Sequence, residues 1–263
     1  MYAPVAPVRI LEQLALHSVL PNYMMIIGTD VHDATVKSYT HLLRSYPNRF
    51  VIMDNGVAEP GGRALSFDEL QYRAHHLNVD VVVPPDVLGD RARTIDSYKE
   101  CIDKNVYQRP LMRVIQGNDV DDIMKCINQF NRLNNNYGYW GIPRWITNQF
   151  GSRLQFLHEI RNVDPLSKIH LLGMSTNIHD DMLCVVQPNV MGIDSANPMV
   201  MARNKTPFSL DMYTHFPRDD YWQDVCLYEL SAYNVDKVSR IISQRKDRRN
   251  VEEVRVNVLD HAQ

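Results

Sequence analysis

Neither a long apolar run nor an excess of charge of one sign occurs in this sequence. The 263 residues include 28 Lys and Arg against 31 Asp and Glu, which gives a formal charge of −3. No apolar stretch reaches the roughly 20 residues that span a bilayer, so a membrane-spanning protein is not expected. The near-neutral balance excludes a protein that holds nucleic acid by overall charge alone, so any such binding needs a local basic surface.

Cysteine is scarce and carries no metal-binding motif. Cys101, Cys126, Cys184 and Cys226 lie far apart, and no CxxC or CxC pair exists, so the spacing of a zinc ribbon is absent. We expect four buried or partly buried free thiols. The first 20 residues, which include Arg9, lack the clean apolar core of a secretory signal. Together these features predict a reducing, cytoplasmic location.

Several catalytic and cofactor motifs are also missing. There is no GxGxxG after the first predicted strand, no P-loop and no HExxH. These absences disfavour a dinucleotide-binding fold, a P-loop NTPase and a zinc protease. His32, with Asp30 and Asp33, is interpreted as a turn-like cluster rather than a metal site. No low-complexity linker divides the chain, so we predict one domain over residues 1–263.

Short apolar runs alternate with longer amphipathic stretches. Seven runs start 21 to 32 residues apart, and continuous apolar runs suit strands buried on both faces of a parallel sheet. The runs are Tyr23–Gly28, Phe50–Met53, Val79–Val83, Leu111–Ile115, Tyr137–Ile142, Ile169–Gly173 and Val190–Ile193. Helices are predicted between them at Asp33–Tyr46, Ser66–Leu77, Arg91–Asn105, Asp119–Leu133 and Gly151–Arg161. Ser66 and Glu69 have the spacing of a capping box.

This alternation is typical of repeated βαβ units and predicts an α/β fold, specifically a (β/α)8 TIM-type barrel. Seven units are visible, and a closed barrel needs eight. We assign the eighth strand to Val225–Leu230 and the closing helix to Val235–Arg245, with an insertion or lid at residues 206–222. A doubly wound open sheet is the alternative, and the missing GxGxxG disfavours it.

Polar residues and glycines stand at the ends of six predicted strands. In a barrel, catalytic residues cluster at the carboxyl ends of the strands, so these segments are expected to surround one mouth. The segments are Asp54-Asn55-Gly56, Pro84-Pro85-Asp86, Gln116-Gly117, Gly141-Ile142-Pro143, Gly173-Met174-Ser175 and Asp194-Ser195. Three of them carry a carboxylate, at Asp54, Asp86 and Asp194.

Carboxylates that act without a metal suit substitution at an acetal carbon. One carboxylate attacks the anomeric carbon and a second handles the proton, through an oxocarbenium-like transition state. The third carboxylate, an amide and a close backbone N–H suit a planar heterocycle such as guanine. Guanine offers its N1–H and 2-amino group to a carboxylate and its O6 to an amide N–H.

The motifs around these residues resemble the tRNA-guanine transglycosylase superfamily, especially its compact branch of 7-deazaguanine DNA-insertion (DpdA-type) proteins of phages and bacteria. The resemblance extends from about Phe50 to Asn204. Met53-Asp54-Asn55-Gly56 is similar to the family's DSGG, Asp86 to the Asp of DE-C, Val114-Ile115-Gln116-Gly117 to VQG, Gly141-Ile142 to GGL, and Leu171-Leu172-Gly173 to LMG. The best match is Asp194-Ser195-Ala196-Asn197-Pro198 with Ala202-Arg203-Asn204, which has the family's D-x-x-x-P and A-R-N spacing.

The resemblance implies a role for each matched residue. Asp194 would be the nucleophile at C1′ of the ribose or deoxyribose, and Asp54 the general acid and base. Asp86 and Gln116 would recognise the base. The rest of the implied pocket is Asn55, Gly117, the Gly141 backbone, Ile142, and Gly173 and Met174 as floor and flank. Such a double displacement at C1′ would retain configuration and needs no cofactor.

The sequence also departs from the family pattern. Val57-Ala58-Glu59 replaces the second Gly and the Phe-Gln of DSGGFQ, Val87 replaces the Glu of DE-C, and Met199-Val200 replaces Thr-Arg. The zinc motif CxCxxC with a following His is missing, and no appended RNA-binding domain fits into the 59 residues after Asn204. Because these parts help to hold tRNA in the family, we expect DNA as the nucleic acid, a free 7-deazaguanine such as preQ0 as the incoming base, and no zinc or other cofactor.

Basic and aromatic side chains predict the contacts with nucleic acid. The candidates are Arg203 near Asp194, Arg218 in an aromatic-rich stretch, and Arg245 and Lys246 in a C-terminal basic cluster. Aromatic rings of that stretch would stack on a flipped base. For Tyr139, Trp140, Arg144 and Trp145, which flank Gly141, pocket wall and core packing are both open.

Three other functions remain open at the level of sequence. The first is the same exchange on tRNA, and the second is a non-catalytic, transglycosylase-like partner subunit. The third is an unrelated barrel glycosidase, which uses similar carboxylates. Barrels of the resembled family often pair, so a homodimer is one expected state. A phage-encoded chain would work in the host cytoplasm.

Overall fold

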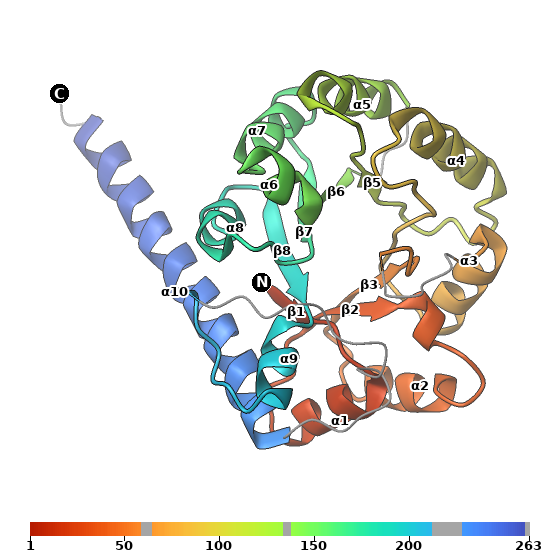
Figure 1. Cartoon of the computed structure of the whole chain (residues 1–263), viewed down its shortest axis with the longest axis vertical. Coiled ribbons are helices and arrows are strands. Elements are labelled where there is room, and N and C mark those ends of the chain that lie inside the picture. The colour runs from red at the N-terminus through yellow and green to blue at the C-terminus, as the bar shows by residue number, and fades with distance from the viewer. Residues whose placement is uncertain (59–64, 134–137, 212–227, 261–263) are drawn as a thin grey trace.

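The computed structural model describes residues 1–58, 65–133, 138–211 and 228–260, the last ten of these by their backbone alone. It shows an α/β fold in which parallel strands lie in the middle and most helices lie outside them (Figure 1). The strands are β1 (Tyr2–Pro4), β2 (Tyr23–Ile27), β3 (Phe50–Asp54), β4 (Val81–Val82), β5 (Arg113–Val114), β6 (Tyr139–Pro143), β7 (Lys168–Leu172) and β8 (Val190–Ser195). The helices are α1 (Val8–Leu16), η1 (Gly28–Asp30), α2 (Val36–Arg44), α3 (Phe67–His76), α4 (Arg91–Lys104), α5 (Val120–Arg132), α6 (Arg144–Phe150), α7 (Leu154–Val163), α8 (Ile178–Val185), α9 (Asn197–Arg203) and α10 (Tyr228–Asp260).

Most of these elements follow from local sequence. The seven predicted apolar runs correspond to β2 through β8, and the five predicted helical segments overlap α2, α3, α4, α5 and α7. At α3 the Ser66 hydroxyl accepts from the Glu69 amide at 3.3 Å and donates to the Glu69 carboxylate at 3.0 Å. These bonds confirm Ser66 as the N-cap, with the Glu69 carboxylate on the Ser66 hydroxyl where a capping box would place it on the backbone amide. Asp90 and Asp119 cap α4 and α5 through their carboxylates.

The strands form two hydrogen-bonded groups in which every pair is parallel. β2, β3 and β4 make one group, and the other has the order β1-β8-β7-β6-β5. A parallel bridge between Val82 and Leu111 links β4 to the residues just before β5. β1 also contacts β2. Because every hydrogen-bonded pair is parallel, the carboxyl ends of the strands lie on one side of the molecule.

The eighth strand is β1, so its predicted assignment to Val225–Leu230 is wrong. β1 pairs in parallel with β8, and the Tyr2 hydroxyl donates to the Ser195 carbonyl at 2.6 Å. Tyr228–Leu230 begins α10, which also contains the predicted closing helix, and residues 225–227 lie outside the described part of the chain. A three-residue strand that ends in proline gives neither an alternating nor a long apolar pattern, which is why the sequence did not reveal it.

The strand side chains alternate between two apolar clusters. In β2, Met24 and Ile26 pack with the surrounding helices, whereas Tyr23, Met25 and Ile27 face a second cluster that the strands themselves form. This second cluster includes Val5, Ile52, Val81, Met112 and Val114. It lies directly beneath the carboxyl ends of the strands and supports the site described below.

Three of the expected free thiols are confirmed. Cys101, Cys126 and Cys184 are buried, and burial raises the pKa of each thiol to about 12. Cys226 and the predicted insertion or lid from residue 212 onward lie outside the described residues. Among the helices that the structure describes, none combines the length and apolar character needed to cross a bilayer.

Candidate active site

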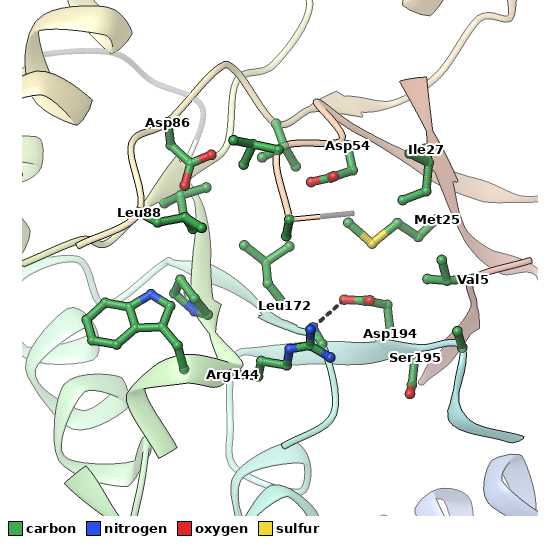
Figure 2. A pocket seen from close by; sticks show the side chains of 18 of the residues that line it. Val5, Met25, Ile27, Asp54, Asp86, Leu88, Arg144, Leu172, Asp194 and Ser195 are labelled. Carbon is green, nitrogen blue, oxygen red and sulfur yellow. Dashed lines mark hydrogen bonds between the residues drawn. The ribbon is translucent and has the colours of Figure 1, made fainter. Parts of the chain in front are cut away.

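A cavity of about 250 Å³ opens at the carboxyl ends of the strands (Figure 2). Three acidic side chains line it: Asp54 from the end of β3, Asp86 from the segment after β4, and Asp194 from β8. Much of the remaining wall is apolar and comes from β2, β7 and the residue after β1, including Met25, Ile27, Leu172 and Val5. Gln116 and Gly173 also line the cavity, so five of the residues predicted to share a pocket do lie together.

Asp194 is held by one of its two carboxylate oxygens. Oδ1 accepts hydrogen bonds from His170 Nε2 at 2.9 Å and from the Gly173 amide at 2.8 Å. Among the described residues, none donates a hydrogen bond to Oδ2. The Asp194 side chain is about 10% exposed, so it is shielded yet reachable from the cavity. A carboxylate anchored in this way presents its second oxygen to a bound molecule.

Gly173 can donate to Asp194 because of its backbone conformation. Its φ is +73°, a value that residues other than glycine rarely adopt. A Cβ at this position would lie 2.9 Å from Cδ of Arg144, so the Arg144 side chain occupies the space beside the glycine. Figure 2 shows Arg144 and Asp194 pointing toward one another at this wall. Arg144 is the only basic side chain among the described residues that line the cavity.

Asp86 receives a hydrogen bond from an amide on each oxygen. Asn55 Nδ2 donates to Oδ1 at 2.9 Å, and Gln116 Nε2 donates to Oδ2 at 2.6 Å. Burial raises the pKa of Asp86 above its ordinary value near 3.8, and these two donors act in the opposite direction by favouring the charged form. Asp86 is 9% exposed, so a ligand in the cavity can reach the carboxylate only through the pocket.

The orientations of both amides are fixed by other donors. The Gln116 Oε1 accepts from the Gly89 amide at 3.0 Å and from the Trp145 indole at 3.1 Å. The Asn55 Oδ1 accepts from the Val57 amide at 2.7 Å. Because an amide flip would bring donors against donors, both NH₂ groups must face Asp86. Asp86 therefore offers its remaining lone pairs to the cavity, which suits a ligand with two adjacent N–H donors.

Asp54 is placed by a tight turn after β3. Its Oδ2 accepts from the Gly56 amide at 2.8 Å, which fixes the carboxylate over the turn. Gly56 has a φ of +82°, and a Cβ there would lie 3.0 Å from the Thr29 side chain, so both conformation and space call for glycine. The turn thus aims Asp54 at the cavity from the wall opposite Arg144 (Figure 2).

The other predicted pocket residues do not line the cavity. Asn55 is buried behind Asp86 and orients it. Gly117 packs where a Cβ would meet the Ile123 amide at 2.8 Å, at the start of α5. Met174 is buried in the core between strands and helices.

The predicted backbone contact from Gly141 is misplaced. Gly141 and Ile142 lie inside β6, where Gly141 pairs with Val114 and His170 in the two neighbouring strands. A Cβ on Gly141 would lie 2.7 Å from Leu172 and 2.9 Å from Met112, so the glycine serves packing between strands. The strand ends at Pro143, one residue after the end of the predicted run at Ile142. Pro143, Arg144 and Trp145 line the cavity in its place, which assigns Arg144 and Trp145 to the pocket wall.

The predicted nucleic-acid residues lie away from the cavity or outside the described chain. Arg203 ends α9 and does not line the cavity, and Arg218 falls in the undescribed residues. Lys246 donates to the Val190 carbonyl at 2.9 Å, at the amino end of β8 and thus at the opposite end of that strand from Asp194. Arg245 is its neighbour on α10. A contact between these residues and nucleic acid stays a prediction, and Lys246 could make it only away from the cavity.

Two buried side chains behind Asp194 were missed by sequence reasoning. His170, in the middle of β7, is fully buried, and Tyr23, the first residue of β2, is nearly so. Each sits within a run of apolar residues, so nothing in the local pattern marked it as polar machinery. In the described part of the chain, no group of three His, Cys, Asp or Glu side chains is arranged to hold a metal ion.

Comparison with known proteins assigns neither a family nor a function to this chain. No family model and no curated protein matches the chain. One similar solved structure is KDPG aldolase from Legionella pneumophila with pyruvate captured at low pH as a covalent carbinolamine intermediate. It is 11% identical, the match covers 90% of this chain and 92% of that chain, and the TM-score is 0.48. This likeness says nothing about the activity of this chain.

Proposed function

We propose that this chain is a pentosyltransferase, built on a (β/α)8-type barrel, that replaces guanine in DNA with a free 7-deazaguanine such as preQ0. The observation that carries the proposal is the cavity shared by Asp194, Asp54 and Asp86. Two of these carboxylates suit displacement at a sugar carbon, and the third faces the cavity as an acceptor of paired N–H donors. The volume is below the roughly 300–1,000 Å³ typical of drug-sized ligands, which suits a single base with its sugar.

The proposed reaction proceeds in two displacements. Asp194 attacks C1′ of the deoxyribose while the bond from C1′ to N9 of guanine breaks, and the departing base takes a proton from Asp54. The incoming 7-deazaguanine then gives its N9 proton to Asp54 and attacks C1′, which releases Asp194. Two inversions retain the β configuration. No cofactor takes part in either step.

Base selection is assigned to Asp86. The N1–H and 2-amino group of guanine, which 7-deazaguanines share, would donate to its two oxygens. Asn55 and Gln116 already donate to the same oxygens, so they keep the carboxylate in place and favour its charged form. The oxygen of Gln116 already accepts two hydrogen bonds, from Gly89 and Trp145. Gln116 is therefore a positioning residue for Asp86 and does not contact the base through its oxygen.

The choice of DNA rests on what the sequence lacks. The tRNA enzymes that it resembles carry a zinc motif that helps to hold tRNA, and this motif does not occur in the sequence. A guanine inside a duplex would have to leave the base stack before its C1′ could reach the cavity, at a cost of a few kcal/mol.

The test is to incubate the purified chain with labelled preQ0 and either DNA or unmodified tRNA. Label in DNA alone supports the proposal, whereas label in tRNA alone shows the tRNA exchange instead.

Replacing Asp86 by asparagine is expected to weaken binding of preQ0 or guanine on the order of 10²-fold, because charge-assisted hydrogen bonds are lost and an NH₂ group faces N–H donors. Binding to the unchanged chain should weaken as the pH falls through the pKa of Asp86. That pKa is raised by burial, so the loss begins at a higher pH than for an ordinary aspartate. Calorimetric titration across pH checks both points.

The control for this prediction is Asp211→Asn, which removes an exposed carboxylate that does not line the cavity. It should leave both the affinity and its pH dependence as they are. If Asp86→Asn keeps the pH dependence of the unchanged chain, another group reads the base and the assignment of Asp86 is wrong.

A further inference from the structure

Asp194 is held from behind by a row of two buried side chains. His170 Nε2 lies 2.9 Å from Asp194 Oδ1, and His170 Nδ1 lies 2.7 Å from the Tyr23 hydroxyl. The three residues belong to β8, β7 and β2, so the row crosses the strands from the interior to the cavity. We call Tyr23 and His170 the relay pair.

The direction of each hydrogen bond follows from the carboxylate at the end of the row, and the phenol is compatible with it. Burial, and after it the nearby charge of Asp194, raises the pKa of Tyr23 well above its ordinary value of 10, so the hydroxyl keeps its proton at neutral pH. A carboxylate oxygen only accepts hydrogen bonds, so Nε2 of His170 is the nitrogen that carries the proton donated to Asp194. In a neutral imidazole Nδ1 is then unprotonated, so it accepts a hydrogen bond from the Tyr23 hydroxyl.

Packing leaves the relay pair little freedom to rearrange. The Tyr23 ring stacks on Phe50 with centroids 5.7 Å apart and planes 10° apart. It also lies against β8 at Gly192, where a Cβ would come within 2.6 Å of the ring. His170 is fully buried, and its ring centroid lies 5.6 Å from that of Tyr23. A donor fixed in this way needs no reorganisation when charge moves at Asp194.

We propose that His170, held by Tyr23, is a positioning residue that fixes Asp194 by Oδ1 and so selects Oδ2 as the atom that bonds to C1′. This inference rests on the proposed function, in which Asp194 is the nucleophile. The Gly173 amide donates to the same oxygen, so the two donors together hold one face of the carboxylate. In the first displacement a lone pair of Oδ2 forms the bond to C1′, and the electron pair of the breaking bond leaves with the base, which Asp54 protonates.

The test compares two substitutions of the same residue. His170→Gln keeps an N–H donor on the side of Asp194, whereas His170→Leu removes it. In His170→Leu we expect kcat for base exchange to fall on the order of 10²-fold, with KM changed by less than about threefold. In His170→Gln we expect kcat to recover at least tenfold relative to the leucine variant. Tyr23→Phe, which leaves Nδ1 without its donor, should show a smaller loss of kcat than His170→Leu.

Matched controls lie on the surface of the same chain. His158→Leu on α7 and Tyr72→Phe on α3 change exposed side chains and should leave kcat unchanged. Nitrogen-15 NMR of the histidines gives a readout that packing alone would not move. We expect His170 to carry its proton on Nε2 in the unchanged chain and to show a mixture of tautomers in Tyr23→Phe.

Three results would overturn the proposal. The first is a normal kcat in His170→Leu. The second is an equal loss in the leucine and glutamine variants together with an equal loss of thermal stability, because that outcome shows a packing role only. The third is a His170 proton on Nδ1. If the unchanged chain transfers no base into DNA or tRNA, the proposed function fails, and the tautomer measurement alone then decides whether the relay pair holds Asp194.

Discussion

Replacing Asp194 by asparagine is expected to lower kcat/KM for base exchange on the order of 10⁴-fold or more and to abolish any covalent adduct. The amide oxygen can still accept from His170 and Gly173, so the fold and the shape of the cavity should persist. What disappears is the second carboxylate oxygen, and an amide nitrogen does not attack C1′. Denaturing quench of a reaction with DNA, followed by mass mapping of the modified peptide, measures the adduct directly.

The control for Asp194→Asn is Asp96→Asn, which removes an exposed carboxylate that pairs with Lys99. It should retain full activity and the adduct. An adduct that maps to Asp54 in the unchanged chain would exchange the two proposed roles. Unchanged activity in Asp194→Asn, in a sample free of any other enzyme, would favour a non-catalytic partner subunit instead.

The largest expected effect on stability comes from Arg153, which is completely buried between α6 and α7. It forms an ion pair with Asp181, which is equally buried, and its Nη1 donates to the carbonyls of Ile142 at 3.0 Å and Gly173 at 3.1 Å. It thus ties β6 and the residue after β7 together beneath the cavity. Arg153→Met should lower the free energy of unfolding by about 3–5 kcal/mol, because Asp181 is left buried without its partner. Chemical denaturation measures this loss.

The pH dependence of the Arg153→Met variant gives a second check. Burial raises the pKa of Asp181 even in the unchanged chain, and Arg153 acts against that rise. Without Arg153 the pKa rises further, and a raised carboxyl pKa in the folded state favours folding at low pH and loses that contribution as the pH increases. The loss of stability should therefore be smaller in acid than at neutral pH.

The matched control for Arg153→Met is Lys104→Met, which breaks an exposed ion pair with Glu100 on α4. Exposed pairs contribute little to stability, so no measurable change is expected. Each substitution removes one charge and keeps an apolar chain. A similar loss of stability in both variants would therefore show that the burial of the Arg153–Asp181 pair has no special effect, and the prediction would be wrong.

The repeating pattern of strand and helix could be predicted because buried parallel strands are continuous apolar runs. The carboxylates at 54, 86 and 194 could be predicted because parallel strands place all their ends on one side. β1 could not be predicted, because three residues are too few to show a hydrophobic pattern. Because β1 was not recognised, the eighth strand was assigned to Val225–Leu230, of which the described residues Tyr228–Leu230 are the start of α10.

The finer structure of the site depends on neighbours that sequence does not reveal. His170 occupies an inward position of an apolar strand, and its partner Tyr23 lies 147 residues away. The role of Asn55 behind Asp86 likewise depends on a fold that brings two strand ends together. At Gly141 the resemblance to the family's GGL motif predicts a backbone contact with the base, whereas the close contact with Leu172 shows that a neighbouring strand requires the glycine.

The two locked amides around Asp86 have a consequence for which purines the cavity would admit. The Asp86 carboxylate can only accept hydrogen bonds from a ligand, and the Asn55 and Gln116 amides cannot rotate to present an acceptor or donor in its place, because other donors hold their oxygens. Adenine carries a lone pair at N1 and would meet it with electrostatic repulsion, and hypoxanthine would leave one oxygen unmatched. Affinity should therefore fall from guanine to hypoxanthine to adenine, an order set by the rigidity of the protein before a purine binds.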